Sequence, residues 1–401
     1  MSTHTTHTSA KAIAGSLLAG TVSAIALVAG PFAGGSEGSI TGAILIGFAI
    51  GWALLTRSSR WAAVPAVVLG LSGATLVILT PSAQALDTLS WIWPPLLLAL
   101  VVWMTFQTRA RLLYPVFAVM ALTAAGCSYE TVASSAGRGG AAPVAGDRLV
   151  DVGGHRLNIR CVGSGAPTVV LEPGLGETAT AMARRIAPEV ARTTRVCVYD
   201  RAGHGRSDVA PDADAARDLH VLLERAHVPG PYVLAGHSLG GMFVLSYADR
   251  YPADVGGVVL LDSMHPRQTH TAADMGSVLD IVPTVARTGI ARLLFDPKAG
   301  EPVAQARQFV RDVEQMPAQL HQAAQLDTLG SRPLGVVTAS NGSQPGWTQH
   351  QNDLAALSSN AFHRTIAGST HQSLIDDPED STASSRAIRV VVVAVRRGEG
   401  A

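Results

Sequence analysis

The sequence predicts an all-α bundle of apolar helices, followed by a mostly parallel α/β sheet with helices on both faces. Three observations support this fold class. Residues 1–127 carry only seven of the chain's charged side chains. After residue 147, short apolar runs alternate with segments of helical periodicity, as in parallel sheets. Residues 236–240 are Gly-His-Ser-Leu-Gly and lie between an apolar run and a helical segment.

The N-terminal region contains five stretches without charged residues, each of roughly the 20 positions that a bilayer span requires. The charges around them alternate in sign. Basic residues precede the first stretch and separate the second from the third and the fourth from the fifth, whereas Glu37 and Asp87 lie in the other loops. By the positive-inside rule, this order predicts a multi-pass protein of the cell membrane with a cytoplasmic N-terminus. The stretches are Ala12–Ser36, Gly38–Thr56, Trp61–Leu86, Thr88–Thr108 and Leu112–Tyr129.

The first stretch could instead be a signal peptide, because it has a basic start and small residues near its end. Four further apolar stretches favour a membrane bundle. No ionisable residue lies in the middle of a predicted span, so we interpret the bundle as an anchor rather than a transport path. The chain then divides into a transmembrane region (1–130), a flexible linker (131–146) and an extracytoplasmic α/β domain (147–401).

The α/β domain begins with a predicted hairpin around Gly153 and Gly154, formed by Arg148–Val152 and Arg156–Val162. Residues 267–331 contain helical runs but no strand, so we expect an insertion that caps the site. Its apolar residues, such as Val282, could line an acyl pocket or pack its own helices. The other predicted strands are Thr168–Leu171, Arg195–Tyr199, Tyr232–Ala235, Val255–Leu261, Leu334–Thr338 and Ala361–Ala367, and the predicted helices are Thr178–Thr193, Ala213–Ala226, Met242–Arg250, Thr348–Leu357 and Pro378–Arg397.

The Gly-x-Ser-x-Gly motif predicts that Ser238 lies on a sharp turn, with its hydroxyl at the end of a strand. A serine hydroxyl is a weak nucleophile unless a neighbouring base takes its proton. His371 follows the last predicted strand and is the candidate base. The alternatives are an ordinary glycine turn and a surface histidine. We expect the adjacent His237 to be structural, whereas His204 and His265 lie in loops from which they could touch a substrate.

Four motifs in this order resemble those of the α/β-hydrolase family, over roughly residues 150–400. Residues 168–176 (TVVLEPGLG) resemble that family's third strand and oxyanion loop. Residues 198–208 (VYDRAGHGRSD) resemble its D-x-x-G-x-G-x-S segment, which marks Asp200 and Asp208 as structural. Residues 236–241 resemble its nucleophile elbow, and residues 368–371 (GSTH) resemble the loop of its catalytic histidine. The resemblance implies an oxyanion hole formed by the N–H groups of Leu239 and Leu175.

The third catalytic residue departs from the family pattern. Many α/β-hydrolases carry the acid after the seventh strand, but residues 339–347 contain no carboxylate. Asp262, at the end of the sixth strand, is the alternative position from which a carboxylate reaches the histidine. Asp353 is the other candidate and lies in a predicted helix. We favour Asp262, which would fix the histidine tautomer and stabilise the imidazolium.

These features predict a membrane-anchored serine hydrolase that cleaves an ester or related acyl bond of a small-molecule or lipid-like substrate. An acyltransferase would use the same residues, and a membrane sensor could keep the fold without activity. Dehalogenases and epoxide hydrolases require an Asp nucleophile. Ser238 occupies that position here, which argues against both classes. We expect no metal or cofactor, because neither metal-ligand spacing nor a dinucleotide signature is present. The balanced charge, 30 basic and 30 acidic residues, gives no indication of a nucleic-acid partner.

The resemblance also implies a disulfide. The family's sheet order places the second and fourth strands side by side, and these strands carry Cys161 and Cys197. Neighbouring strands lie about 4.8 Å apart, within the range that a disulfide can bridge. Such a bond persists in oxidising surroundings, as expected for an extracytoplasmic domain. The alternative is a pair of reduced cysteines that act as small buried apolar residues.

Overall fold

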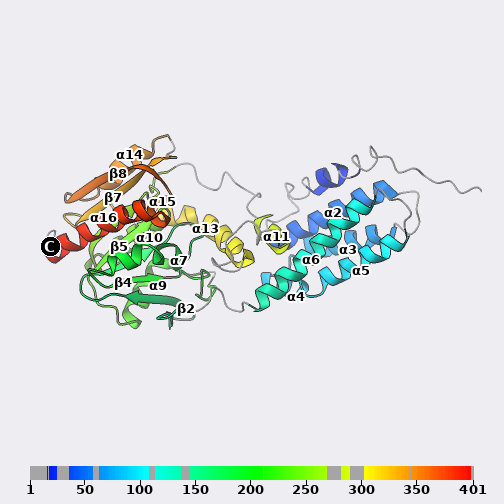
Figure 1. Cartoon of the computed structure of the whole chain (residues 1–401), viewed down its shortest axis with the longest axis horizontal. Helices are drawn as coiled ribbons and strands as arrows, with labels where there is room; N and C mark the ends of the chain where they lie inside the picture. The colour runs from blue at the N-terminus through cyan, green and yellow to red at the C-terminus, as the bar shows by residue number, and fades with distance from the viewer. Residues whose placement is uncertain are drawn as a thin grey trace, which may run out of the picture. The chain divides into compact units, whose positions relative to one another are not determined.

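The computed structural model describes residues 16, 18–24, 36–56, 63–107, 113–136, 144–210, 212–268, 281–289, 302–342 and 345–398. The chain forms two compact units (Figure 1). The helical unit comprises residues 1–138, 275–297 and 301–307, and the α/β unit comprises residues 139–274, 298–300 and 308–401. Each unit is described separately below.

The helical unit joins the N-terminal helices to part of the insertion that we expected to cap the α/β domain. Helix α2 packs along α3, α5 packs along α6, and α11 from the insertion contacts both α2 and α6. Val282 of α11 packs against Ala286, Val303 and Ala306, so this apolar residue packs helices of its own insertion. The helices are α2 (Glu37–Thr56), α3 (Ala63–Leu79), α4 (Ala83–Leu89), α5 (Trp93–Gln107), α6 (Tyr114–Ala136), α11 (Ile281–Arg287) and the first residues of α13 (Pro302–Ala323).

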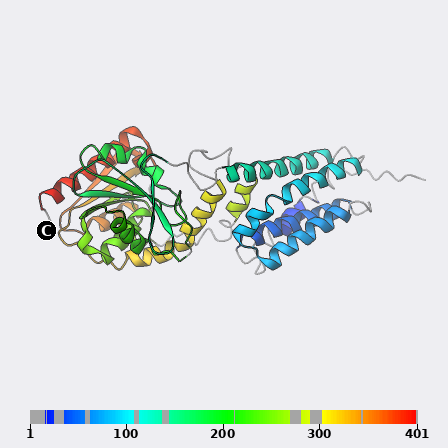
Figure 2. The ribbon, with the colours of Figure 1, turned by 90° about the horizontal axis from the view of Figure 1, so that it is seen from below.

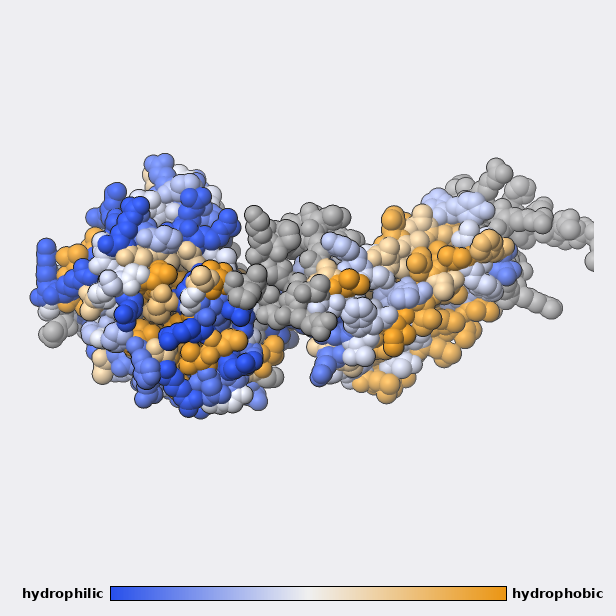
Figure 3. Space-filling view, turned by 60° about the horizontal axis from the view of Figure 1, so that its bottom comes forward, coloured by the Kyte–Doolittle hydropathy of each residue, from blue (hydrophilic) through white to orange (hydrophobic). Residues whose placement is uncertain are grey.

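Within the described residues, two helices are long and apolar enough to cross a membrane, namely the segments Glu37–Leu54 and Tyr114–Ser135. The pair α4 and α5, bent by 42°, would be a third, and α3 is apolar but shorter. Figure 3 shows broad hydrophobic surface on the N-terminal helices, whereas the visible face of the α/β unit carries hydrophilic residues interspersed with smaller hydrophobic patches. Most of the first predicted span, Ala12–Ser36, lies outside the described residues.

Two predicted boundaries in this region are wrong. The predicted span Trp61–Leu86 is broken, because α3 ends at Leu79 and α4 begins at Ala83. Pro81 lacks the N–H group that a continuous helix needs, and Ser82 caps α4 by accepting a hydrogen bond from the N–H of Ala85. The linker starts later than residue 131, since α6 continues to Ala136 and the Ser134 hydroxyl bonds the Glu130 carboxylate.

The α/β unit contains an eight-stranded sheet of order β1-β2-β4-β3-β5-β6-β7-β8. The β1–β2 and β2–β4 pairs are antiparallel, and the other pairs are parallel. This confirms the predicted hairpin and the mostly parallel sheet. The strands are β1 (Arg148–Asp151), β2 (Arg156–Val162), β3 (Thr168–Glu172), β4 (Val196–Tyr199), β5 (Tyr232–His237), β6 (Val255–Leu261), β7 (Leu334–Asn341) and β8 (Ala361–Thr370).

Helices cover both faces of this sheet (Figure 2). Alternate residues of the central strands β3 to β7 enter two separate apolar cores, as the period of two in a β-strand requires. One core includes residues of α9 (Ala215–Arg225), α10 (Gly240–Arg250), the end of α13 and α14 (Trp347–Ala355). The other includes residues of α7 (Ala179–Ala183), α8 (Ile186–Val190), α15 (Ser373–Asp376) and α16 (Pro378–Arg396). Because β3, β5, β6, β7 and β8 run parallel, their carboxyl ends meet at one edge of the sheet.

The antiparallel pairing of β2 with β4 sets Cys161 opposite Cys197, and their sulfur atoms form a disulfide. Cys127, in α6, is not part of a disulfide.

Candidate active site

Ser238 lies between the end of β5 and the start of α10. Its φ angle is +56°, a left-handed conformation that is rare for a residue with a side chain. A larger residue does not fit at the flanking glycine positions, since a Cβ on Gly236 would lie 2.6 Å from the carbonyl carbon of Gly240. The side chain is partly exposed at the carboxyl edge of the sheet. Strained turns of this kind persist where the surrounding packing fixes them, and they are concentrated at functional sites.

His371 and Asp262 are brought together from different strands. His371 follows β8, and Asp262 follows β6 with a φ angle of +44°. The Nδ1 atom of His371 lies 2.7 Å from Oδ2 of Asp262. The other oxygen of Asp262, Oδ1, accepts hydrogen bonds from the backbone N–H of Ala339 at 3.1 Å and from Nε1 of Trp347 at 2.8 Å. The carboxylate is therefore buried and bonded through both of its oxygens, while the His371 side chain is 44% exposed.

The competing acid, Asp353, lies elsewhere. It is part of α14, its side chain is exposed, and it accepts a hydrogen bond from Nε2 of Gln349 at 2.8 Å. No hydrogen bond joins Ser238 directly to His371 in the described part of the chain. Such bonds are often long in structures without substrate and shorten when substrate binds.

His237 connects the elbow to the loop that carries His371. Its Nε2 atom lies 3.1 Å from the backbone oxygen of His371, and its Nδ1 atom lies 3.4 Å from Oε2 of Glu177. Burial alone would lower the pKa of His237, but the bond and charge of Glu177 raise it overall. Burial likewise opposes ionisation of Glu177, yet His237 lowers the pKa of that carboxyl. The two residues therefore form a part-buried, hydrogen-bonded pair beside the site. Sequence reasoning did not single out Glu177.

In the loop after β3, the backbone N–H group of Leu175 has no hydrogen-bond acceptor among the described residues. The N–H of Gly174 donates to Glu177, and the N–H of Gly176 donates to Asp312. Among the described residues, neither the Leu175 N–H nor the Leu239 N–H donates a hydrogen bond. The loop lies against the elbow, because a Cβ on Gly174 would be 3.1 Å from the Cβ of Ser238. Both N–H groups predicted to form the oxyanion hole are therefore unoccupied donors near Ser238.

The remaining candidate residues have structural partners. Asp200 is buried and accepts hydrogen bonds from the Asn158 side chain and from the backbone N–H groups of Ala179 and Arg206. Asp208 pairs with Arg156 at 2.9 Å. His265 stacks on His350, with ring centroids 4.7 Å apart, and His204 pairs with Asp312. No cluster of His, Cys, Asp or Glu that could hold a metal ion occurs among the described residues.

Comparisons with known proteins identify the fold of this unit. A sequence model described as the alpha/beta hydrolase fold matches residues 167–299. The crystal structure of a candidate lipase from Acinetobacter baumannii is similar, with a TM-score of 0.50, 22% identity and coverage of 63% of this chain and 92% of that one. The α/β unit therefore has the α/β-hydrolase fold.

Two curated relatives match part of this chain. The uncharacterized protein YbdG of Bacillus subtilis is 30% identical over 128 residues, which is 30% of this chain and 38% of that protein. The 2-hydroxymuconate semialdehyde hydrolase of Pseudomonas sp. (strain CF600) is 34% identical over 122 residues, which is 29% of this chain and 43% of the enzyme. The alignments thus span less than half the length of these relatives.

Proposed function

From the α/β-hydrolase fold of this chain we propose that the protein is a membrane-anchored serine hydrolase that cleaves an ester or related acyl bond. Ser238 is the nucleophile, His371 the base, and Asp262 the carboxylate that orients the base. The observation that carries the proposal is the 2.7 Å contact between His371 Nδ1 and Asp262 Oδ2, next to a strained serine turn. The proposed substrate is a small-molecule or lipid-like acyl compound, and the chemistry requires no metal or cofactor.

The proposed reaction has two halves. In the first, Nε2 of His371 takes the hydroxyl proton of Ser238 as Oγ bonds to the acyl carbon. The N–H groups of Leu175 and Leu239 bind the negative oxygen of the tetrahedral intermediate. The proton then passes to the leaving alcohol, and the acyl group remains on Ser238. In the second half, His371 takes a proton from water, the hydroxide attacks the acyl carbon, and the carboxylic acid leaves as Oγ regains the proton.

We expect a fluorophosphonate probe to label the full-length protein at Ser238, because this reagent reacts with serines that a neighbouring base activates. Turnover of p-nitrophenyl esters of increasing chain length then identifies the acyl group that the enzyme prefers. Product analysis with an added alcohol separates a hydrolase from an acyltransferase, since only the latter transfers most of the acyl group to the alcohol. A folded protein that is neither labelled nor active on any ester would leave the non-enzymatic sensor as the better proposal.

The helical unit supports a membrane location for this enzyme. Arg287 and Arg307 of the insertion bind Glu37 and Asp87, two acidic residues of the N-terminal helices. Near them the Thr131 hydroxyl, late in α6, donates to the Ser90 oxygen. The insertion, the acidic residues and the end of α6 thus share one end of this unit. Because the positive-inside rule assigns the acidic loops to the outer side, we propose that the α/β unit is extracytoplasmic.

Two measurements test this orientation. We expect a reporter fused after Ala401 to be active outside the cytoplasm, and unreduced peptides to contain Cys161 linked to Cys197. Closing a loop of 36 residues contributes ~3–4 kcal/mol in the chain-entropy model, so reduction should lower the midpoint of thermal unfolding. A cytoplasmic reporter signal, or free thiols at both positions in protein isolated with its thiols trapped, would contradict the proposed location.

A further inference from the structure

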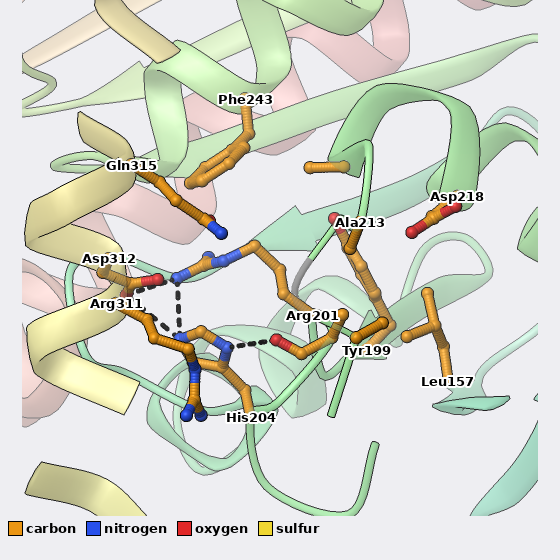
Figure 4. Close-up of a pocket in the computed structure, with 13 residues that line it drawn as sticks. Leu157, Tyr199, Arg201, His204, Ala213, Asp218, Phe243, Arg311, Asp312 and Gln315 are labelled. Carbon is orange, nitrogen blue, oxygen red and sulfur yellow. Dashed lines mark hydrogen bonds and ion pairs between the residues drawn. The ribbon is translucent and has the colours of Figure 1, made fainter. Parts of the chain in front are cut away.

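The oxyanion loop, residues 173–176, rests on a buried cluster of charged side chains. Arg201, which follows β4, donates to the Glu172 carboxylate at 2.7 Å and to the Asp312 carboxylate at 3.0 Å. His204 lies 3.0 Å from the same Asp312 oxygen. Figure 4 shows Arg201, His204 and Asp312 pointing toward one another, with Asp312 on α13. None of these side chains belongs to the proposed catalytic set.

The cavity beside this cluster is too small to be a substrate site. Its volume is about 30 Å³, which holds one or two water molecules. Ser238 does not line it, whereas Arg201, Asp312 and Asp218 do. The cluster instead contacts the oxyanion loop directly, through hydrogen bonds to Pro173, Gly174 and Gly176.

Arg201 fixes the direction of the Leu175 N–H group. Its guanidinium donates to the backbone oxygen of Pro173 at 2.7 Å and to that of Gly174 at 3.0 Å. The Gly174 carbonyl and the Leu175 N–H belong to one planar trans peptide, so they point in opposite directions. A carbonyl held by Arg201 consequently turns the Leu175 N–H away from Arg201 and leaves it free to bind another acceptor.

Asp312 fixes the next peptide. Its Oδ2 atom accepts the Gly176 N–H at 2.7 Å, in addition to the bonds from Arg201 and His204. Burial alone would raise the pKa of this carboxyl, but Arg201 and His204 lower it to about 2, so it is ionised at neutral pH. The loop also packs closely against α13, the helix that carries Asp312. Gly176 has a φ of +66°, and a Cβ there would lie 3.1 Å from the ring of Phe309 in α13. Both peptides that flank Leu175 are thus held by charged side chains.

We propose that Asp312, acting with Arg201, is a positioning residue that aims the Leu175 N–H group at the oxyanion. Helix α13 of the insertion thereby completes the site rather than only covering it. This inference rests on the proposed function, because the oxyanion forms only if acyl transfer occurs. Oxyanion donors depend on such preorganisation, and loss of one donor typically lowers kcat by about 10²–10³. Misdirection of a donor should have a smaller effect.

The test compares Asp312→Ala with a matched control in the full-length protein. Asp218 lines the same cavity and is also buried, but it pairs with His155 and has no bond to the oxyanion loop (Figure 4). We expect Asp312→Ala to lower kcat on short-chain esters by about 10- to 100-fold with KM changed less than about twofold, because only the transition state uses the oxyanion donor. Asp218→Ala should leave kcat within about twofold. Asp312→Asn should recover most of the activity, since its amide oxygen can still accept the Gly176 N–H.

A second measurement does not depend on activity. Hydrogen exchange of the peptide that contains residues 173–178 should accelerate in Asp312→Ala and remain unchanged in Asp218→Ala. If Asp312→Ala does not fold, Asp312→Ser replaces it, because its shorter side chain cannot bridge Gly176 and Arg201. Equal losses of kcat in the Asp312 and Asp218 variants, or unchanged loop exchange in the Asp312 variant, would overturn the proposal. An inactive, unlabelled wild type would instead refute the serine hydrolase, and the exchange experiment would still decide whether Asp312 holds the loop.

Discussion

Ser238→Ala should abolish fluorophosphonate labelling and lower ester turnover by about 10⁴ or more. The expected loss is large because catalytic serine, histidine and carboxylate act as a unit, so removal of the nucleophile removes the whole covalent route. The fold should survive, since the hydroxyl of Ser238 makes no hydrogen bond among the described residues, whereas its backbone N–H still donates to the Leu261 oxygen at 3.1 Å. Labelling, ester turnover and thermal unfolding of the same preparation check this prediction.

Ser246→Ala is the matched control. Ser246 lies two turns further along α10, is buried, and donates its hydroxyl to the Met242 oxygen at 2.8 Å. A loss of that local bond should change stability slightly and leave labelling intact. If folded Ser238→Ala is labelled as fast as the wild type, another nucleophile carries the chemistry and the proposed function is wrong.

The parallel sheet was predictable because its determinants are local in sequence. Each buried strand is a short apolar run such as Val258–Leu261. The sharp turn at Ser238 needs a glycine two residues before and two residues after the serine, and the sequence contains both. The position of Asp262 was also predictable, because no carboxylate follows β7 and the next available strand end carries one. The structure places Asp262, and not Asp353, next to His371.

The sequence prediction was wrong where a single proline breaks a helix that the hydrophobic periodicity predicts as continuous. The segment Thr178–Thr193 was predicted as one helix, yet the structure contains α7 and α8, with a break at Arg184 and Arg185. Pro188 cannot donate to the carbonyl of residue 184, and its ring would clash with that carbonyl in a continuous helix. The same effect at Pro81 divides the predicted third span.

The other omissions concern contacts between residues far apart in sequence. Asp312 lies 136 positions after Gly176, whose N–H it accepts, and Arg287 lies 250 positions after Glu37. No sequence motif predicts either contact. The helical periodicity of the insertion shows which face of a helix is apolar, but it does not show which distant residues that helix contacts. Glu177 could have been identified from the sequence, because it is a carboxylate that directly follows the predicted oxyanion loop.

Asp262→Asn should lower kcat by up to roughly 10⁴ while the protein remains folded, through the wrong tautomer of His371. The geometry determines how the new amide would lie. In the wild type, Oδ1 of Asp262 accepts two N–H donors, from Ala339 and Trp347. The amide oxygen of an asparagine would keep that position, because an NH₂ group there would face two donors. Its NH₂ group would then occupy the place of Oδ2 and donate to Nδ1 of His371.

This arrangement would move the ring proton to Nε2, the atom that must accept the proton of Ser238. His371 could then no longer act as the base, although every residue of the site would stay in place. KM should change little, and fluorophosphonate labelling should slow in parallel with kcat, since both reactions need the same base. Asp353→Asn is the control and should retain activity within about twofold, because its side chain is exposed and, among the described residues, is bonded only to Gln349. A large loss in Asp353→Asn together with an active Asp262→Asn enzyme would reverse the assignment of the acid.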